Sequence, residues 1–275
     1  MTNPDVLQPP TVSHPFANRL LALAAATWLA VATVGQWLFG IYILMFYGKT
    51  TLMGDFDRWN EVLPDRALER NGTVVVGIHI LLAAILAFGG PLQLIPGVRR
   101  QFPVFHRWLG RVFVITAMVV SAAGLVMILN KWETGDAIQD ISISIQAIYI
   151  ILFGWLVIRY ARARQFARHR VWALRLFMVV NGVWFFRVGL MFWLVVNGGP
   201  VGFDPETFTG PFLTTLALLT YAIPLSLLVL ELYFLALRKQ NKALSLCVSA
   251  LIFLCTIIMG IGIFGATLGL WLPQM

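Results

Sequence analysis

Seven long apolar stretches, separated by short polar connections, make up most of the chain. Each stretch has about 20 residues or more, which is the length that a helix needs to cross the hydrocarbon core of a bilayer. The pattern therefore predicts an all-α, polytopic transmembrane bundle that forms a single integral-membrane domain over residues 1–275. The predicted spans cover residues 20–47, 73–95, 108–130, 141–160, 172–197, 212–237 and 244–271.

The connections differ in charge, and this difference predicts the orientation of the bundle. Cytoplasmic loops of membrane proteins carry an excess of Lys and Arg. With the N-terminus inside and the C-terminus outside, fourteen such residues fall on the cytoplasmic side and five on the outer side. The cytoplasmic set is Arg19, Arg99, Arg100, Arg107, Arg111, Arg159, Arg162, Arg164, Arg168, Arg170, Arg175, Arg238, Lys239 and Lys242. The outer set is Lys49, Arg58, Arg66, Arg70 and Lys131.

Composition supports a membrane-embedded chain and narrows the partners. Hydrophobic residues make up 59% of the sequence and charged residues 12%, whereas soluble domains carry about 25% charged residues. The net charge of +8 comes mostly from residues at the ends of the spans, where basic side chains face lipid head groups. We therefore expect the lipid bilayer as the partner and no nucleic acid.

Polar side chains inside the spans are costly and usually have a function. Arg187 lies in the outer half of the fifth span, and His79 and Gln146 lie at a comparable depth in the second and fourth. These three residues are predicted to form an outer polar cluster if their helices face one another. The alternative is that Arg187 extends toward the outer surface or binds backbone carbonyl groups at a helix break.

A second charged residue, Glu231, lies about 9 Å from the cytoplasmic end of the sixth span. Arg111 and Arg175 lie at similar depths on two other spans. An ion pair of Glu231 with either arginine would keep both side chains charged inside the membrane. Such a pair is either a static contact between helices or part of a ligand site.

Two related motifs open spans at the cytoplasmic side. Residues 100–111 read RQFPVFHRWLGR, and residues 164–175 read RQFARHRVWALR. This similarity predicts a duplicated helix hairpin, with residues 73–130 corresponding to residues 141–197. It places His106 and His169 at the same depth on two different helices.

The paired histidines and their arginines have several chemical interpretations. His106 and His169 could coordinate a haem iron as axial ligands, while arginines neutralise the propionates. The same side chains could instead bind a quinone head group or lipid phosphates. The arginines concerned are Arg107, Arg111, Arg170 and Arg175.

The spacing between histidine and arginine separates these interpretations. It is five residues in the first motif and six in the second, which corresponds to different faces of a regular helix. One helix start must therefore hold an extra residue before or within its first turn. We expect the arginines to turn toward Glu231 and the histidines to stay at the rim. Imidazole nitrogens more than about 10 Å apart would exclude a shared iron.

The spans also contain residues that shape helices. Pro91 and Pro224 are predicted to kink the second and sixth spans. Gly265 and Gly269 form a face of small residues in the last span, which is typical of close helix contact. No predicted span has a lysine near its middle that could form a retinal Schiff base. The sequence also contains no Walker, Cys-x-x-Cys or HExxH motif.

Taken together, these elements resemble an uncharacterised family of bacterial membrane proteins, domain of unknown function 2306. The resemblance covers roughly residues 73–237. It implies a polytopic protein of the bacterial inner membrane and brings no known activity. The matching elements are His79, GGPLQL at 89–94, HRWLGR at 106–111, HRVWALR at 169–175, Arg187 and Glu231.

The sequence favours a membrane protein that binds an anionic or amphiphilic small ligand, such as a lipid head group or a quinone. The ligand would contact the rim of arginine and histidine, together with the intramembrane Arg187 and Glu231. A redox protein holding haem b or a quinone is the first alternative, and an accessory subunit of a larger membrane complex is the second. No reaction is assigned by the sequence.

The charge distribution gives a direct test of topology. Reporter fusions in loops 48–72, 131–140 and 198–211 should all report a periplasmic location, because these loops fall on the side that is poor in Lys and Arg. A cytoplasmic signal from any two of them would contradict the predicted orientation.

Overall fold

The computed structural model describes residues 14–61, 72–130 and 135–275, and every regular element within this part is a helix. Three short π-helical segments (Leu44–Gly48, Leu218–Ala222 and Thr267–Trp271) continue α1, α9 and α11. The α-helices are α1 (Pro15–Ile43), α2 (Lys49–Met53), α3 (Gly72–Leu94), α4 (Pro96–Gln101), α5 (Pro103–Leu129), α6 (Ala137–Arg162), α7 (Phe166–Val180), α8 (Gly182–Asn197), α9 (Pro211–Ala217), α10 (Leu225–Lys239), α11 (Lys242–Ala266) and α12 (Leu272–Gln274).

Five to seven of these segments are long and apolar enough to cross a membrane. Within the described residues, five continuous helical stretches meet the requirement, and two bent pairs raise the number to seven if each pair is one span. The predicted all-α membrane bundle is therefore confirmed, and each predicted span coincides with one of these stretches. The continuous stretches are Pro15–Met53, Val74–Leu94, Pro103–Leu129, Ala137–Arg162 and Lys242–Gln274.

The two bent pairs have different causes. The second pair joins Pro211–Ala222 to α10 at an angle of 45°, and Pro224 lies at this bend as the N-cap of α10, as predicted. The first pair joins α7 to α8 at 48°, and the break falls at Asn181, which the sequence pattern did not indicate. Pro91, by contrast, lies within the continuous helix α3.

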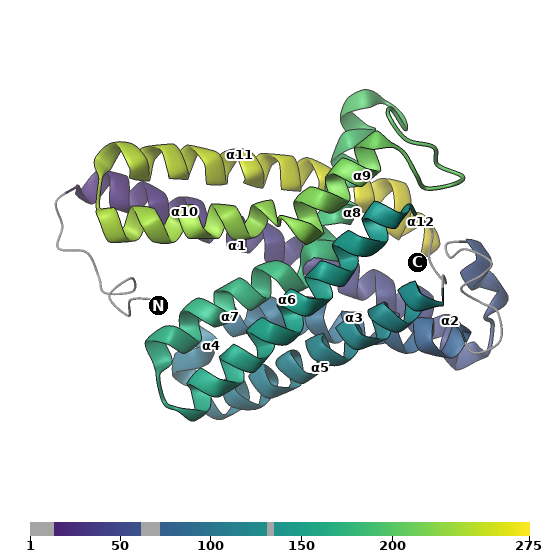
Figure 1. Ribbon diagram of the computed structural model, residues 1–275, viewed down its shortest axis with the longest axis horizontal. Coiled ribbons are helices and arrows are strands. Elements are labelled where there is room, and N and C mark those ends of the chain that lie inside the picture. Colours follow the sequence, from purple (N-terminus) through teal and green to yellow (C-terminus); the bar gives the residue numbers. More distant parts are fainter. Residues whose placement is uncertain (1–13, 62–71, 131–134) are drawn as a thin grey trace.

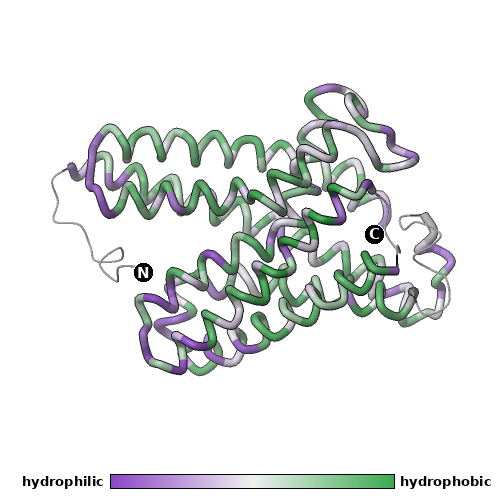
Figure 2. Tube along the Cα trace, viewed as in Figure 1, coloured by the Kyte–Doolittle hydropathy of each residue, from purple (hydrophilic) through white to green (hydrophobic). Residues whose placement is uncertain are grey.

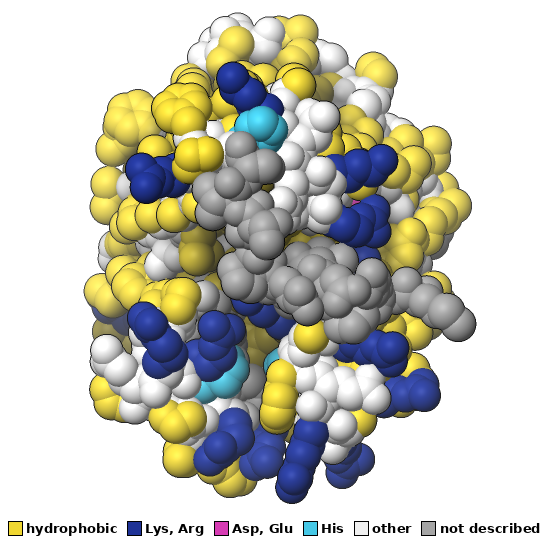
Figure 3. Space-filling model, turned by 90° about the vertical axis from the view of Figure 1, so that its left-hand side faces the viewer, with side chains coloured by type: hydrophobic (Ala, Val, Ile, Leu, Met, Phe, Trp, Pro, Cys, Tyr) yellow, Lys and Arg dark blue, Asp and Glu magenta, His cyan; other side chains and the backbone are white. Residues whose placement is uncertain are grey.

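The helices run between two ends of the bundle that differ in polarity (Figures 1 and 2). One end, which we call the basic end, contains the start of α1, the helix α4, the α6–α7 turn and the α10–α11 turn. The opposite end contains α2 and the C-terminus. Figure 3 views the basic end and shows Lys and Arg side chains spread around it. The basic loops therefore share one end, as the charge count requires. Arg66, Arg70 and Lys131 of the opposite set lie outside the described residues.

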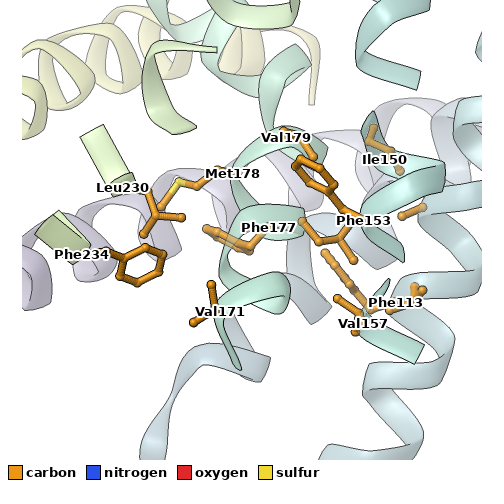
Figure 4. Close-up of a cluster of buried hydrophobic side chains, with 13 residues drawn as sticks. Phe113, Ile150, Phe153, Val157, Val171, Phe177, Met178, Val179, Leu230 and Phe234 are labelled. Carbon is orange, nitrogen blue, oxygen red and sulfur yellow. The ribbon is translucent and has the colours of Figure 1, made fainter. Parts of the chain in front are cut away.

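A buried apolar cluster joins α5, α6, α7 and α10 toward the basic end (Figure 4). Phe177 lies at its centre, with Phe153 from α6 on one side and Leu230 and Phe234 from α10 on the other. Lipid tails are as apolar as these side chains, so close packing rather than removal from water favours their contact. The cluster therefore specifies how α10 docks on α7.

Glycines bring α11 very close to α8. A Cβ atom at Gly262 would collide with the carbonyl oxygen of Val188, and one at Gly265 would lie 2.6 Å from Cγ2 of Val195. Gly269 has only ordinary contact distances, with Met191 at 3.6 Å. The predicted close contact of the last span is therefore present, and Gly262, which the sequence did not single out, is its tightest point.

An ion pair joins α7 to α10 beside the apolar cluster. Arg175 donates from Nε to Oε1 of Glu231 at 2.6 Å and from Nη2 to Oε2 at 3.0 Å. Its guanidinium group also lies 4.6 Å from the centre of the Trp172 ring. Of the two predicted partners of Glu231, Arg175 is the correct one. Arg111 is exposed and lies over Trp108 instead.

Replacing Glu231 by Gln should destabilise the protein, because Arg175 would keep its charge inside the bundle without a carboxylate. We expect a loss of about 1–3 kcal/mol of unfolding free energy, less than for a fully buried pair, because the Glu231 side chain is 42% exposed. Thermal unfolding in detergent measures this loss. The double variant Arg175→Met/Glu231→Leu should recover much of it; equal instability of the single and double variants would contradict a coupled pair.

Candidate functional site

A cavity of about 200 Å³ lies between α1, α3, α5, α6 and the α7–α8 break, toward the end opposite the basic end. Most of its wall is apolar, with contributions such as Phe39, Ile80 and Ala83. Hydrophobic walls with a few placed polar groups are typical of small-molecule sites. The polar or hydrogen-bonding side chains that line it belong to Gln36, Tyr42, Tyr47, His79, Ser121, Gln146, Asn181, Trp184 and Arg187.

The three residues of the predicted outer polar cluster all line this cavity. His79 comes from α3, Gln146 from α6 and Arg187 from α8. Their helices do face one another, which was the condition that the sequence analysis placed on the cluster. Glu231 and the residues of the two His-Arg motifs do not line it.

Arg187 is the cationic group of the cavity. Its guanidinium carbon lies 5.4 Å from the centre of the Phe39 ring on α1. Within the described part of the chain, no carboxylate forms an ion pair with it. Among the described residues, no hydrogen bond from Arg187 to a backbone carbonyl group is present, which does not favour the alternative role at a helix break. Arg187 is exposed, which is compatible with the other alternative, that its side chain extends toward the outer surface. The guanidinium group therefore has no ion-pair partner among the described residues.

Gln146 has a structural task at the edge of the same cavity. Its Nε2 donates to the carbonyl oxygen of Val179 at 2.6 Å, in the last turn of α7. Gly182 leaves room for this contact, since a Cβ atom there would collide with Nε2 of Gln146. Asn181 in turn donates from Nδ2 to the carbonyl oxygen of Phe177 at 2.7 Å. These side chains bind backbone carbonyl groups beside the break, as helix breaks inside a membrane require.

Other polar atoms at the cavity have no protein partner. Gln36 is 1% exposed, and neither its Nε2 nor its Oε1 forms a hydrogen bond with the protein. The same holds for Nε1 of Trp184, which is 4% exposed, and for Nδ1 of His79. A buried polar group without a partner costs about 1–3 kcal/mol. Groups of this kind at a cavity are therefore candidates for ligand contacts.

Sequence reasoning missed Gln36 and Trp184. Gln36 is a strongly polar residue in the middle of the first apolar stretch, so the argument that identified Gln146 could also have identified it. Trp184 gave no such signal, because an apolar ring inside a span is ordinary and only its position shows that its N–H is unpaired.

The two His-Arg motifs occupy equivalent positions at the basic end. His106 and His169 each lie four residues after an N-cap, Phe102 and Gln165, and each backbone N–H donates to the carbonyl oxygen of that N-cap at 2.9 Å. The extra residue of the first motif lies before the helix start, where α4 ends. The motifs are thus equivalent as helix starts.

Their side chains do not follow the predicted arrangement. Nδ1 of His169 lies 3.2 Å from the carbonyl oxygen of Val157 on α6, and Nδ1 of His106 is buried. Arg111 points outward, and its guanidinium lies 4.7 Å from the centre of the exposed Trp108 ring. The prediction that both arginines turn inward was therefore wrong for Arg111. The reason is the offset of five rather than six residues, which rotates Arg111 by about 100° relative to Arg175 on a regular helix.

The basic end gives no support to a haem or quinone site. Arg107 and Arg170 are exposed, and Arg175 is engaged by Glu231. Of the arginines that were expected to surround a shared ligand, three are therefore exposed and the fourth is held by Glu231.

Comparison with known proteins agrees with this architecture. No curated protein and no solved structure matches the chain. The family described as "Predicted membrane protein (DUF2306)" matches residues 76–223, which is more than half of the chain. The matched range includes the cavity residues His79, Gln146 and Arg187 and both His-Arg motifs, whereas Gln36 and Glu231 lie outside it. The chain therefore belongs to the DUF2306 family of predicted membrane proteins.

Proposed function

We propose that this protein binds a small anionic or amphiphilic ligand in the cavity, with Arg187 as the residue that binds the anionic group. The observation that supports this function is a guanidinium group at the wall of the cavity that has an aromatic ring beside it and no carboxylate partner in the described part of the chain. Arg187 is an exposed residue, so an anion can reach it. Glu231, the other intramembrane charge, belongs to the ion pair at the basic end and has no place in this site.

The energetics of Arg187 favour an anionic partner. Contact with an aromatic ring contributes about 0.5–2 kcal/mol. An arginine at the centre of a membrane helix costs about 2.5–3.5 kcal/mol, and Arg187 costs less than this because it is exposed in the outer half of its span. A carboxylate or phosphate group would supply the missing charge and accept two parallel hydrogen bonds from the guanidinium group. Arg187 therefore gains more from an anionic ligand than from a neutral one.

The remainder of the cavity favours a small ligand with an apolar part. Its volume of about 200 Å³ is below the range of about 300–1,000 Å³ that drug-sized ligands occupy. Phe39, Ile80 and Ala83 offer apolar contacts next to the polar groups. A compact carboxylate with a short apolar body matches both properties.

Thermal unfolding with simple carboxylates tests this function. Benzoate and hexanoate should stabilise the detergent-solubilised protein, by about 2.7 kcal/mol at a concentration of 100 times Kd. Neutral benzamide, which has the shape of benzoate without its charge, should not. Arg187→Gln should abolish the effect, and Arg238→Gln, which removes an exposed arginine at the basic end, should leave it intact. Equal stabilisation by benzamide, or of Arg187→Gln, would contradict the proposal.

We further propose that the basic end lies in the cytoplasm of a bacterial cell, in the inner membrane, and binds anionic lipid head groups. Stacked pairs of arginine and aromatic rings support this role. The guanidinium of Arg111 lies 4.7 Å from the centre of the Trp108 ring, and that of Arg159 lies 5.1 Å from the centre of the Trp155 ring. Both tryptophans are exposed. Amphipathic rings and basic side chains at this level are typical of contact with the membrane interface.

Retention of lipids through purification tests the second role. Native mass spectrometry of protein reconstituted with phosphatidylglycerol and phosphatidylethanolamine should show preferential retention of phosphatidylglycerol. The double variant Arg107→Gln/Arg111→Gln should retain less of it, because two exposed cations are lost from the basic end. Lys49→Gln removes an exposed cation from the opposite end and serves as the control. Equal retention by all three proteins would argue against a lipid-binding basic end.

A further inference from the structure

The two bent spans contact each other where they break. Gly182 follows the first break, and a Cβ atom at this glycine would lie 3.0 Å from the carbonyl oxygen of Thr220. Thr220 belongs to the π-helical segment that ends just before the second break. The backbones of the two spans therefore touch at the level where each of them bends. We propose that the two breaks act as one hinge, about which α8 and α9 tilt together against α7 and α10.

One neighbouring helix supplies a hydrogen-bond donor to each break. Gln146 of α6 donates to the carbonyl oxygen of Val179 at the first break, and the hydroxyl group of Tyr149 donates to that of Ala222 at the second, at 3.3 Å. The donors are three residues apart and are therefore neighbours on one face of α6. A carbonyl group that a break leaves inside a membrane needs such a partner. Because these partners are side chains with rotatable bonds, they can follow the carbonyl groups when the bend angles change.

The helices on the two sides of the breaks are joined in separate pairs. Toward the basic end, α7 and α10 are held together by the ion pair of Arg175 with Glu231 and by the apolar cluster around Phe177. Toward the opposite end, α8 packs against the π-helical continuation of α9 through Phe186 and Tyr221, whose ring centres lie 5.3 Å apart. Each pair can therefore move as a unit, so that the bends of 48° and 45° change together.

The local backbone and the position of the breaks also favour a hinge. The π-helical segment Leu218–Ala222 directly precedes the second break, and π-helical turns interrupt the regular hydrogen-bond ladder and are frequent at functional sites. Val180, Asn181 and Val183, at the first break, line the cavity. A change of angle at the hinge would therefore change the shape of the cavity.

Hydrogen–deuterium exchange on the full chain in detergent tests the hinge without a ligand. Tyr149→Phe removes the donor at the second break alone, and Gln146→Leu removes the donor at the first. Each variant should raise amide exchange at both breaks, in peptides covering residues 176–186 and 217–228, by about two- to tenfold, as expected for the loss of one hydrogen bond. Ser144→Ala is the control, because this hydroxyl group donates to the carbonyl oxygen of Asp140 within α6, and it should change neither peptide.

The outcomes distinguish one hinge from two independent kinks. An effect of each variant at its own break alone, or at neither break, would overturn the proposal. Tyr149→Phe keeps the ring that stacks on Phe153, so this variant decides the question even if Gln146→Leu does not fold. Benzoate bound at Arg187 should lower exchange at both breaks, and protection of the first break alone would also contradict the hinge. Failure of benzoate to bind would count against the proposed function only, because the comparison of variants needs no ligand.

Discussion

The requirement that backbone polar groups be satisfied inside a membrane determines the form of this bundle at one position above all. The helix that enters from the basic end breaks at Asn181, and the carbonyl oxygen of Val179 accepts a hydrogen bond from Gln146 on the neighbouring helix α6. Without such a donor, a break in hydrocarbon would leave backbone groups unpaired at a cost of several kcal/mol. With it, α8 can leave at 48° to α7. The cavity lies where these two directions diverge.

Two arginines on the same bent pair of helices illustrate two ways of holding a charge in a membrane. Arg175 lies before the break and is held by both oxygens of Glu231 and by the face of Trp172. Arg187 lies after the break; its guanidinium group lies over the face of Phe39, and no carboxylate among the described residues forms an ion pair with it. The first arrangement neutralises the charge and joins two helices. The second leaves the charge without an ion-pair partner among the described residues, which is why we propose ligand binding at the cavity and a structural role for the ion pair.

The sequence predicted the spans but not which way their side chains face. Length and hydrophobicity located every span, and Pro224 indicated one of the two bends, because proline removes a backbone donor. The break at Asn181 has no such marker, since it depends on Gln146 of α6, which is distant in sequence. Arg111 and Arg175 looked alike in their motifs. Lipid-facing and buried positions of a span are both apolar, so only the structure showed that one arginine points outward and the other inward.

The helix α11 contributes no residue to the wall of the cavity, yet it determines the distance across it. Its Ile263 side chain occupies the space beside Gly35 on α1, and its Gly262 lies against the backbone of Val188 on α8. Gly35 precedes Gln36, and Val188 follows Arg187. Two adjacent residues of α11 thus act as a spacer between the helices that carry the two polar ends of the cavity. A change of one methyl group on this spacer would therefore alter the width of the cavity, although the residue concerned does not line it.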